Sequence, residues 1–363
     1  MERRLNRIDE YIKLEETTEL RILGIETSCD ETAAAVVENG RIILGQTIAS
    51  QIDIHTKFGG VVPEMASRVH VETITQVVEQ TLVESGITWS DLDGIAVTCG
   101  PGLLGALLVG VSAAKGYALA TGLPLIPVHH IAGHVAAALI DNAVDLPFLA
   151  LVVSGGHTEI LSVDEQFVFT RLGGTKDDAA GEAYDKVARM VGLAYPGGPK
   201  VDEMAAKGNP VAFSFPRSLI DEDNYDFSFS GLKTSVLNEI NQRRQKGDEV
   251  PVADLCASFQ QAVVEVLVEK AARAMKQTGS NQLVVAGGVA ANQGLRKALQ
   301  ERAKQDSFKV HFPPLSLCTD NAAMIAAAGT KALERGLTHD LSLDAYATLS
   351  LADWQAGRFP RRA

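Results

Sequence analysis

The sequence has few cysteines, no surplus of positive charge and no long apolar run, and each deficit excludes a class of protein. The four cysteines, Cys29, Cys99, Cys256 and Cys318, are far apart and form no CxxC pair. Neither a disulfide scaffold nor a zinc ribbon is therefore predicted, and a reduced, cytoplasmic setting is the simplest interpretation. The net charge of −12 argues against a surface that coats nucleic acid throughout, although a local basic patch or a basic partner remains compatible with it. The longest apolar stretch, residues 103–114, is shorter than the ~20 residues of a membrane span.

Glycine, in contrast, is plentiful and clustered. The chain has 363 residues, of which 46% are hydrophobic and 32 are glycine. This length suggests about two domains of ~150 residues each. Residues 1–20 carry ten charges and no apolar core, so they predict a polar extension rather than a signal peptide.

The same order of elements occurs twice along the chain. Three strands come first, with an Asn39-Gly40 hairpin turn in the first copy, and helices then alternate with further strands. The expected strands cover residues 21–28, 33–38, 41–50, 93–99 and 123–128 in the first copy and 147–156, 157–163, 167–173, 282–288 and 308–314 in the second. We predict an N-terminal lobe over 21–145, a C-terminal lobe over 146–346 whose last helices can pack back on the first lobe, and a tail over 347–363. Two such lobes would face each other across a cleft, where α/β folds bind ligands.

Three strand ends carry small residues that suit phosphate binding. They are residues 26–30 (Glu-Thr-Ser-Cys-Asp), residues 154–157 (Ser-Gly-Gly-His) and residues 284–292 (Val-Val-Ala-Gly-Gly-Val-Ala-Ala-Asn). Backbone N–H groups in such loops can approach phosphate oxygens, and hydroxyl groups add donors. Each loop alone could be a tight β-turn, but the matching positions of the first two favour a ligand.

Residues 100–105 match the pattern GxGxxG after a strand. A dinucleotide site also requires an acidic residue at the end of the next strand. That strand ends Pro127-Val128-His129, without an acid. The pattern therefore predicts tight packing between a strand and a helix instead.

His130 and His134 are four residues apart on an expected helix, so they share one face. This is a spacing of metal ligands, although two polar residues facing a cleft would show it as well. The residue after His130 is Ile131, so the general base of an HExxH peptidase is missing. Asp320, near the start of a late helix, is a candidate third ligand, and its alternative role is to cap that helix.

Two further segments carry charged groups. Asp185 and Asp202 lie on either side of a Tyr-Pro-Gly-Gly-Pro turn, where they could hold ribose hydroxyls or simply be solvated. Residues 51–70 include His55, Lys57, Arg68 and His70, so they form a locally basic segment that could contact a polyanion or be an ordinary surface loop.

Together the motifs resemble those of the TsaD-type tRNA N6-adenosine threonylcarbamoyltransferases, formerly described as glycoproteases. The resemblance covers residues 21–346 and rests on GIETSCDET, FGGVVPEMASRVH, GPGLLGALLVG, HHIAGH, LVVSGGHTEI, GEAYDKVARMVGLAYPGGP, DFSFSGLKTSV, VVAGGVAAN and LCTDNAAMIAAAG. It implies the α/β fold of actin, Hsp70 and sugar kinases, with two ribonuclease-H-like lobes around a nucleotide cleft. It also implies transfer of threonylcarbamoyl from threonylcarbamoyl-AMP to N6 of the adenosine 3′ of the anticodon, in tRNAs reading codons that begin with A.

The resemblance also assigns residues. It implies His130, His134 and Asp320 as ligands of one divalent metal, with Fe(II) the first choice and Zn the second. Asp30 and Glu31 match the family's acidic pair, where they would orient the attacking amine. The implied substrate-binding residues are Val153, Ser154, Gly155, Gly156, His157, Asp185, Gly198, Asp202 and Asn292. One departure is Ala132, where the family often has Glu.

The implied partners are tRNA, threonylcarbamoyl-AMP, a paralogous pseudo-enzyme subunit and a small ATPase, and no membrane is expected. Three other functions fit parts of the sequence. A small-molecule kinase on the same fold would not need the histidine pair, and a metallopeptidase would need the missing Glu. A noncatalytic scaffold would not need the His/His/Asp set.

Overall fold

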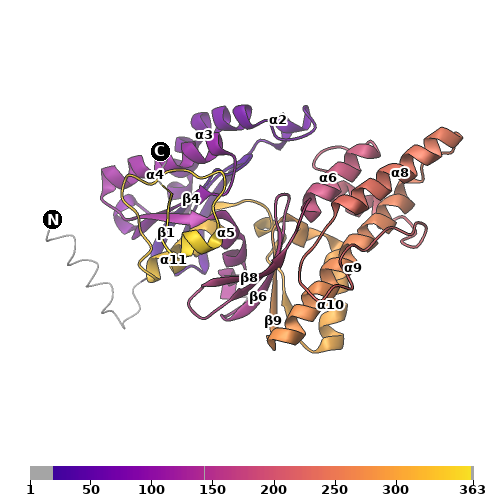
Figure 1. Ribbon diagram of the computed structural model, residues 1–363. Coiled ribbons are helices and arrows are strands. Elements are labelled where there is room, and N and C mark those ends of the chain that lie inside the picture. The colour runs from indigo at the N-terminus through magenta and orange to yellow at the C-terminus, as the bar shows by residue number, and fades with distance from the viewer. Residues whose placement is uncertain (1–18, 143, 361–363) are drawn as a thin grey trace.

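The computed structural model describes residues 19–142 and 144–360 (Figure 1). The first sheet contains β1 (Arg21–Glu26), β2 (Glu31–Glu38), β3 (Ile42–Ser50), β4 (Gly94–Gly100) and β5 (Leu125–His129). The second contains β6 (Phe148–Val153), β7 (Thr158–Val163), β8 (Phe169–Gly174), β9 (Gln282–Ala286) and β10 (Lys309–His311). The polar extension predicted for residues 1–20 lies, up to residue 18, outside the described residues, as do the last three residues of the tail.

Both sheets have the same topology. Their strand orders are β3-β2-β1-β4-β5 and β8-β7-β6-β9-β10, which correspond position by position. In each sheet the first three strands are antiparallel, and the last two run parallel to the first. The duplicated plan read from the sequence is therefore present in the structure.

The predicted hairpin turn lies between β2 and β3. Asn39 and Gly40 both have positive φ, 54° and 67°, a conformation that asparagine and glycine tolerate best. Beside the turn, Arg21 Nε donates to Glu38 Oε2 across the β1–β2 pair at 3.0 Å.

Helices connect and cover the strands. In the first lobe they are α2 (Ile52–Thr56), α3 (Pro63–Ser85), α4 (Leu104–Thr121) and α5 (His130–Ala136), with 3-10 turns η1 (Trp89–Asp91) and η2 (Ala137–Asn142). In the second they are α6 (Ala180–Met190), α7 (Gly197–Ala205), α8 (Ser230–Lys246), α9 (Val252–Thr278) and α10 (Gln293–Asp306), with η3 (Gly288–Ala291) and η4 (Leu315–Leu317). Then follow α11 (Ala322–Glu334) and α12 (Leu351–Gln355).

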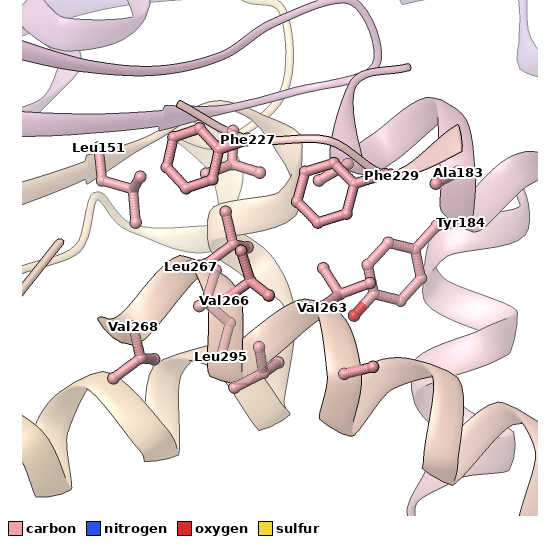
Figure 2. Packing of buried hydrophobic residues seen from close by; sticks show 14 of the residues in the cluster. Leu151, Ala183, Tyr184, Phe227, Phe229, Val263, Val266, Leu267, Val268 and Leu295 are labelled. Atoms are coloured by element: carbon pink, nitrogen blue, oxygen red, sulfur yellow. The ribbon is translucent and has the colours of Figure 1, made fainter. Parts of the chain in front are cut away.

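The core of the second lobe lies between its sheet and the long helix α9. Leu151 of β6, Phe227 and Phe229 pack against Val263 and Leu267 of α9, and all five are buried (Figure 2). Burying side chains of this size supplies most of the driving force for folding the lobe.

Helix α11 returns from the second lobe to the first, as the sequence allowed (Figure 1). It packs on β1 at Gly24, where a Cβ atom would lie 2.4 Å from the carbonyl oxygen of Ala322. A Cβ atom on Gly329 of α11 would lie 2.4 Å from Ala96 of β4, and one on Gly133 of α5 would lie 2.6 Å from Ile325. These glycines let backbones approach, so the segment just before α11 is held against α5.

Helices α7 and α8 were not predicted from the sequence, because their first turns are capped by residues distant in sequence. Asp185 Oδ1 accepts hydrogen bonds from Gly197 N at 2.8 Å and Gly198 N at 3.2 Å, so the Gly-Gly pair starts a helix. At α8, Asp177 Oδ1 accepts in the same way from Phe229 N and Ser230 N. Sequence rules for helix starts consider only neighbouring residues.

Among the described residues, α4 is long and apolar enough to cross a membrane by length and composition alone. In this fold it is a surface helix of the first lobe. One face, including Leu107, Val111 and Ala114, is buried against α3 and β4. Its other face is largely exposed, since only 33% of its residues are buried.

Candidate metal and nucleotide site

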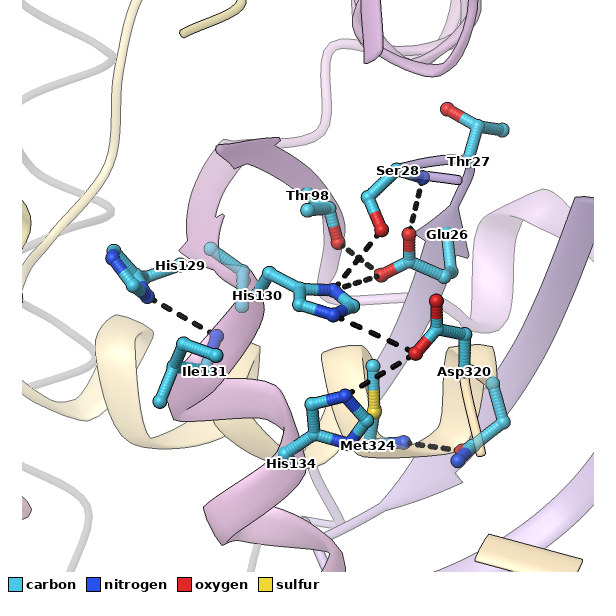
Figure 3. Close-up of polar contacts among 12 residues, drawn as sticks. Glu26, Thr27, Ser28, Thr98, His129, His130, Ile131, His134, Asp320 and Met324 are labelled. Carbon is cyan, nitrogen blue, oxygen red and sulfur yellow. Dashed lines mark hydrogen bonds and ion pairs between the residues drawn. The ribbon is translucent and has the colours of Figure 1, made fainter. Parts of the chain in front are cut away.

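His130, His134 and Asp320 converge between the two lobes (Figure 3). The Nε2 atoms of His130 and His134 lie 3.5 Å and 3.2 Å from Asp320 Oδ1. One potential ligand atom from each residue lies within 4.8 Å of the others. Two imidazole nitrogens and a carboxylate oxygen at this separation can hold one divalent cation, so the His/His/Asp group is a possible metal site.

The imidazole of His130 is oriented by the first strand. Its Nδ1 lies 3.3 Å from Glu26 Oε2 and 3.1 Å from Ser28 Oγ, so its Nε2 faces Asp320. Glu26 is fully buried, and Thr98 Oγ1 donates to its Oε2 at 2.7 Å. A carboxylate behind a histidine in this way fixes the ring and makes the outer nitrogen a better ligand.

The electrostatic environment favours positive charge on His130 but disfavours it on the nearby His157. Burial disfavours the charged imidazole of His130, but the carboxylates of Asp320 and Glu26 raise its pKa to about 9. Burial and the positive charge of the other two histidines lower the pKa of His157, from the second lobe, to about 4. The charge on His130 and the hydrogen bond from His134 hold the pKa of Asp320 below its ordinary value, although burial opposes this.

Asp320 does not cap the following helix, which excludes the alternative that the sequence left open. The N-cap residue of α11 is Asn321, whose side chain accepts from Met324 N at 2.9 Å. Since its neighbour caps the helix, the Asp320 carboxylate is left to face the two histidines.

His129 has a different role from the next histidine along the chain. Its Nδ1 accepts from Ile131 N at 3.1 Å and caps α5, so its Nε2 carries the proton and donates to the Leu349 carbonyl at 2.9 Å. It is buried and points away from the His/His/Asp group (Figure 3).

The first strand-end loop differs from expectation. Its hydroxyl groups were expected to serve phosphate oxygens, but Thr27 Oγ1 donates to the Ala106 carbonyl and Ser28 Oγ contacts His130. The loop also packs against the GxGxxG segment: a Cβ on Gly102 would lie 2.7 Å from the Ser28 carbonyl oxygen. Gly102 therefore serves close packing, as predicted, but its partner is the loop after β1 rather than a strand or helix.

The loops of the second lobe are open where the sequence predicts a ligand. Added Cβ atoms on Gly155, Gly156, Gly198 and Gly288 would meet no atom within 4 Å. Gly287, in contrast, has a φ of +90° and lies against the Val153 carbonyl, which brings the ends of β9 and β6 together. The backbone of these loops is thus accessible to a nucleotide.

The predicted nucleotide-binding carboxylates lie beside these loops but already have protein partners. Asp185 caps α7 through one oxygen. Asp202 Oδ1 accepts from Gln260 Nε2 at 2.8 Å and its Oδ2 from Gln293 N at 2.9 Å. Asn292 caps α10 through Leu295 N.

Asp30 lies just before β2, and Glu31 is the first residue of that strand. Glu31 Oε1 accepts from Ser50 Oγ at 3.0 Å, whereas Oε2 is buried and has no partner among the described residues. Burial and the neighbouring Asp30 carboxylate raise the pKa of Glu31 to about 8. Tyr195, from the second lobe, is close enough for Asp30 and Glu31 to raise the pKa of its phenol.

This raised pKa predicts a pH dependence of stability. Between the ordinary pKa of 4.5 and about 8, the folded chain keeps the Glu31 proton that the unfolded chain loses. The folded state then binds more protons, so the free energy of unfolding falls as the pH rises through this window. We expect the melting temperature of Glu31→Gln to fall less than that of wild type between pH 4.5 and about 8. Thermal melts in a chelating buffer would measure this.

The matched control is Asp53→Asn, an exposed acid in α2. It should keep the wild-type slope between pH 4.5 and 8. If Glu31→Gln and wild type had parallel profiles, the Glu31 carboxyl would not be held protonated by the fold.

The segment 51–70 is not the basic surface loop considered above. It contains α2 and the start of α3, and His55 and His70 are buried. Its tip contacts the second lobe, since Arg189 donates to the Gly59 carbonyl at 2.6 Å. Of its basic groups, Lys57 and Arg68 are exposed, and Arg68 pairs with Glu64.

Sequence reasoning missed two polar side chains that organise the site, Glu26 and Gln260. The available signal for Glu26 was an acid at the end of a buried strand. For Gln260 it was a glutamine among apolar residues of a helix. Neither signal identifies a partner, because both partners come from other segments of the chain.

The comparisons with known proteins agree on one family. A sequence model described as tRNA N6-adenosine threonylcarbamoyltransferase matches residues 42–327. A protein of this name from Geobacillus thermodenitrificans is 56% identical over 91% of this chain and 96% of its own length. The Bacillus subtilis protein of the same name is 54% identical over 94% and 99%.

A solved structure shows the fold. HypF of T. kodakarensis superposes with a TM-score of 0.62 at 16% identity, over 89% of this chain and 49% of HypF. With the two-lobed topology above, this confirms the predicted α/β fold class of actin-like and sugar-kinase-like proteins.

Proposed function

Since this chain belongs to the tRNA N6-adenosine threonylcarbamoyltransferase family, we propose how its residues carry out that activity. The chain is an acyltransferase that modifies tRNA. It moves a threonylcarbamoyl group from threonylcarbamoyl-AMP to N6 of the adenosine 3′ of the anticodon, in tRNAs reading codons that begin with A. The N6 amine attacks the carbamoyl carbon and gives up one proton, the bond from that carbon to the phosphate oxygen breaks, and AMP leaves.

The observation that carries the proposal is the convergence of His130, His134 and Asp320. In the proposed site these three residues hold one divalent metal, and Glu26 orients His130 behind it. The donor set suits Fe(II) first and Zn second. When bound, the metal supplies Lewis-acid chemistry toward the carbonyl of the threonylcarbamoyl group.

The second lobe binds the AMP part of the donor in this proposal. Backbone N–H groups of residues 153–157 and of Gly198 bind the phosphate. The glycines of these loops leave space for it, since an added Cβ atom would meet no atom within 4 Å. Asp185, Asp202 and Asn292 hold the nucleoside in this proposal. Asp185 accepts its two protein hydrogen bonds through Oδ1, and each Asp202 oxygen accepts one, so both carboxylates retain acceptor positions.

Asp30 and Glu31 face this site from the first lobe and orient the attacking amine. Asp30 is half-buried, and Glu31 Oε2 beside it is buried without a partner among the described residues. The donor is an activated mixed anhydride, so what the chain supplies is mainly the orientation of two substrates.

The test of the function is transfer to tRNA with and without metal. We expect purified protein, threonylcarbamoyl-AMP and tRNA to yield the modified nucleoside on nucleoside analysis. Chelation should reduce the yield about a hundredfold or more, and anaerobic Fe(II) should restore it better than Zn. Full transfer by protein shown to be metal-free would contradict the metal assignment, and no transfer by metal-loaded protein with its partners would contradict the activity.

The proposal includes two protein partners, a paralogous pseudo-enzyme subunit and a small ATPase, in the cytoplasm. Exposed apolar side chains on both α3 and α4 support a docking partner at these helices. They are Val71 and Val83 of α3 and Leu104 and Leu119 of α4, which are between 36% and 81% exposed. The net charge of −12 also suggests that partners help to hold tRNA.

We expect Leu119→Asp to weaken binding of the paralogous subunit about tenfold or more, because it places a charge in an apolar interface. Size-exclusion chromatography with multi-angle light scattering of the mixed subunits would measure this. The control is Val211→Asp, which changes an 81% exposed valine of the second lobe. Equal association by both variants would contradict docking at α3 and α4.

A further inference from the structure

Gln260 of α9 connects the residues proposed to hold the nucleoside. Its Nε2 donates to Asp202 Oδ1 at 2.8 Å, and its Oε1 accepts from Asn292 Nδ2 at 2.8 Å. The Tyr184 hydroxyl donates to the same Oε1 at 3.3 Å. Three segments that are distant in sequence, α6, α7 and the start of α10, thus meet at one amide.

The surroundings of Gln260 make these bonds costly to lose. The residue is 8% exposed and lies among buried apolar residues of α9, such as Phe259 and Val263. A buried amide without partners is destabilising, and the bond to the Asp202 carboxylate is of the stronger, charge-assisted kind.

A glycine of α10 leaves space for this amide. A Cβ on Gly294 would lie 2.6 Å from Gln260 Nε2 and 3.3 Å from Asn292 Oδ1. Gln260 and Gly294 also line an open groove of about 700 Å³ between α9 and α10. The amide therefore lies between the residues proposed to bind the nucleoside and this groove. Any side chain at position 294 would collide with it.

We propose that Gln260 is a positioning residue for the nucleotide part of the donor, which it serves by fixing Asp202 and Asn292. This inference rests on the proposed nucleotide site. Asp202 Oδ2 accepts from Gln293 N and Asn292 Oδ1 accepts from Leu295 N, so each side chain is held at one end, and Gln260 holds the other end of both. Without Gln260, Asp202 Oδ1 and Asn292 Nδ2 would lose this shared partner, and the nucleoside would have to order them on binding.

The test compares Gln260→Met with wild type, each as the full chain with its metal and partners. AMP is the probe for binding, and threonylcarbamoyl-AMP is the donor in the transfer assay. Met keeps the length and shape of the side chain and removes all three hydrogen bonds. We expect the Kd for AMP and the KM for the donor to rise about tenfold. The KM for tRNA and the kcat at saturating donor should stay within about twofold.

The control is Gln261→Met, the same change at the next residue of α9. Gln261 bonds to Glu265 and lines the same groove, but contacts neither Asp202 nor Asn292. It should leave both constants for the nucleotide unchanged. A merely structural role for Gln260 predicts a lower melting temperature with wild-type AMP affinity in the folded protein, and that result would overturn the inference.

A second variant keeps the test informative if Gln260→Met does not fold. Gly294→Ala removes no polar group and replaces a glycine within a helix by a better helix former. Its methyl group must displace Gln260 Nε2. We expect about threefold or greater loss of AMP affinity in the folded protein, with a smaller decrease in melting temperature than Gln260→Met causes, and unchanged affinity would count against the proposal.

Failure of the inference can be told apart from failure of the proposed site. Asp202→Ala and Asn292→Ala should each weaken AMP binding if the site is correct. If neither does, or if wild type itself binds no nucleotide, the site is wrong and the inference falls with it. If both do while Gln260→Met binds AMP normally, the site stands and the role of Gln260 is refuted.

Discussion

His134→Ala should purify as folded protein, contain well under half of the wild-type metal, and lose transfer to tRNA by about a thousandfold. The side chain is 2% exposed and its Nε2 faces Asp320 Oδ1 at 3.2 Å. In the proposed site this change removes one of three protein ligands, which would forfeit several kcal/mol of Lewis-acid stabilisation, and each ~1.4 kcal/mol is a factor of ten in rate. Metal analysis and a transfer assay on the same preparation measure both effects.

The neighbouring histidine provides the control. His129→Ala removes an equally buried imidazole that caps α5 and bonds to Leu349. It should lower the melting temperature yet keep the wild-type metal content. The metal content of Glu26→Gln should lie between those of the two alanine variants. Its metal affinity should be reduced about 10- to 100-fold, because the partner of His130 Nδ1 loses its charge. Full transfer activity in His134→Ala would refute a catalytic metal at this position.

Gly24→Val should destabilise the chain by about 3 kcal/mol or more and lower its metal content as well. The added atoms would collide with the backbone of α11, at 2.4 Å from the Ala322 carbonyl oxygen and 2.6 Å from the Ala326 amide nitrogen. A helix backbone cannot move aside as a flexible side chain does, so α11 must shift. Asp320, two residues before α11, would shift with it away from the two histidines.

Thermal melts and metal analysis of Gly24→Val would measure the two effects. Gly116→Ala, in α4, serves as the control, since a Cβ there meets no atom within 4 Å. This change should leave metal content unchanged and stabilise the chain by about 0.5–1 kcal/mol, because alanine loses less backbone entropy in a helix than glycine. If Gly24→Val melted like wild type, α11 would not be packed on β1 as described.

Where the sequence and the structure agree, the relevant interactions are local. Strand periodicity and the Asn39-Gly40 turn predict the first hairpin, and the i, i+4 spacing predicts that His130 and His134 share a helix face. Where they disagree, the missing information is a distant partner. From the sequence, the Gly-Gly pair within Tyr195–Pro199 indicates a turn. In the structure, the Asp185 carboxylate accepts hydrogen bonds from both glycines, and α7 begins there.

The sequence by itself determined the duplicated fold plan, the family motifs and the kinds of ligand atom available, because these depend on residue types and on neighbours along the chain. Only the tertiary structure decided which side chains meet. Asp320 reaches the histidines because glycines at Gly24 and Gly329 admit α11 against the first sheet. Glu26 and Gln260 gain their roles in the same way, from partners on other elements. The physical reason is that contacts between distant segments depend on the packing of whole helices and sheets, which no local pattern encodes.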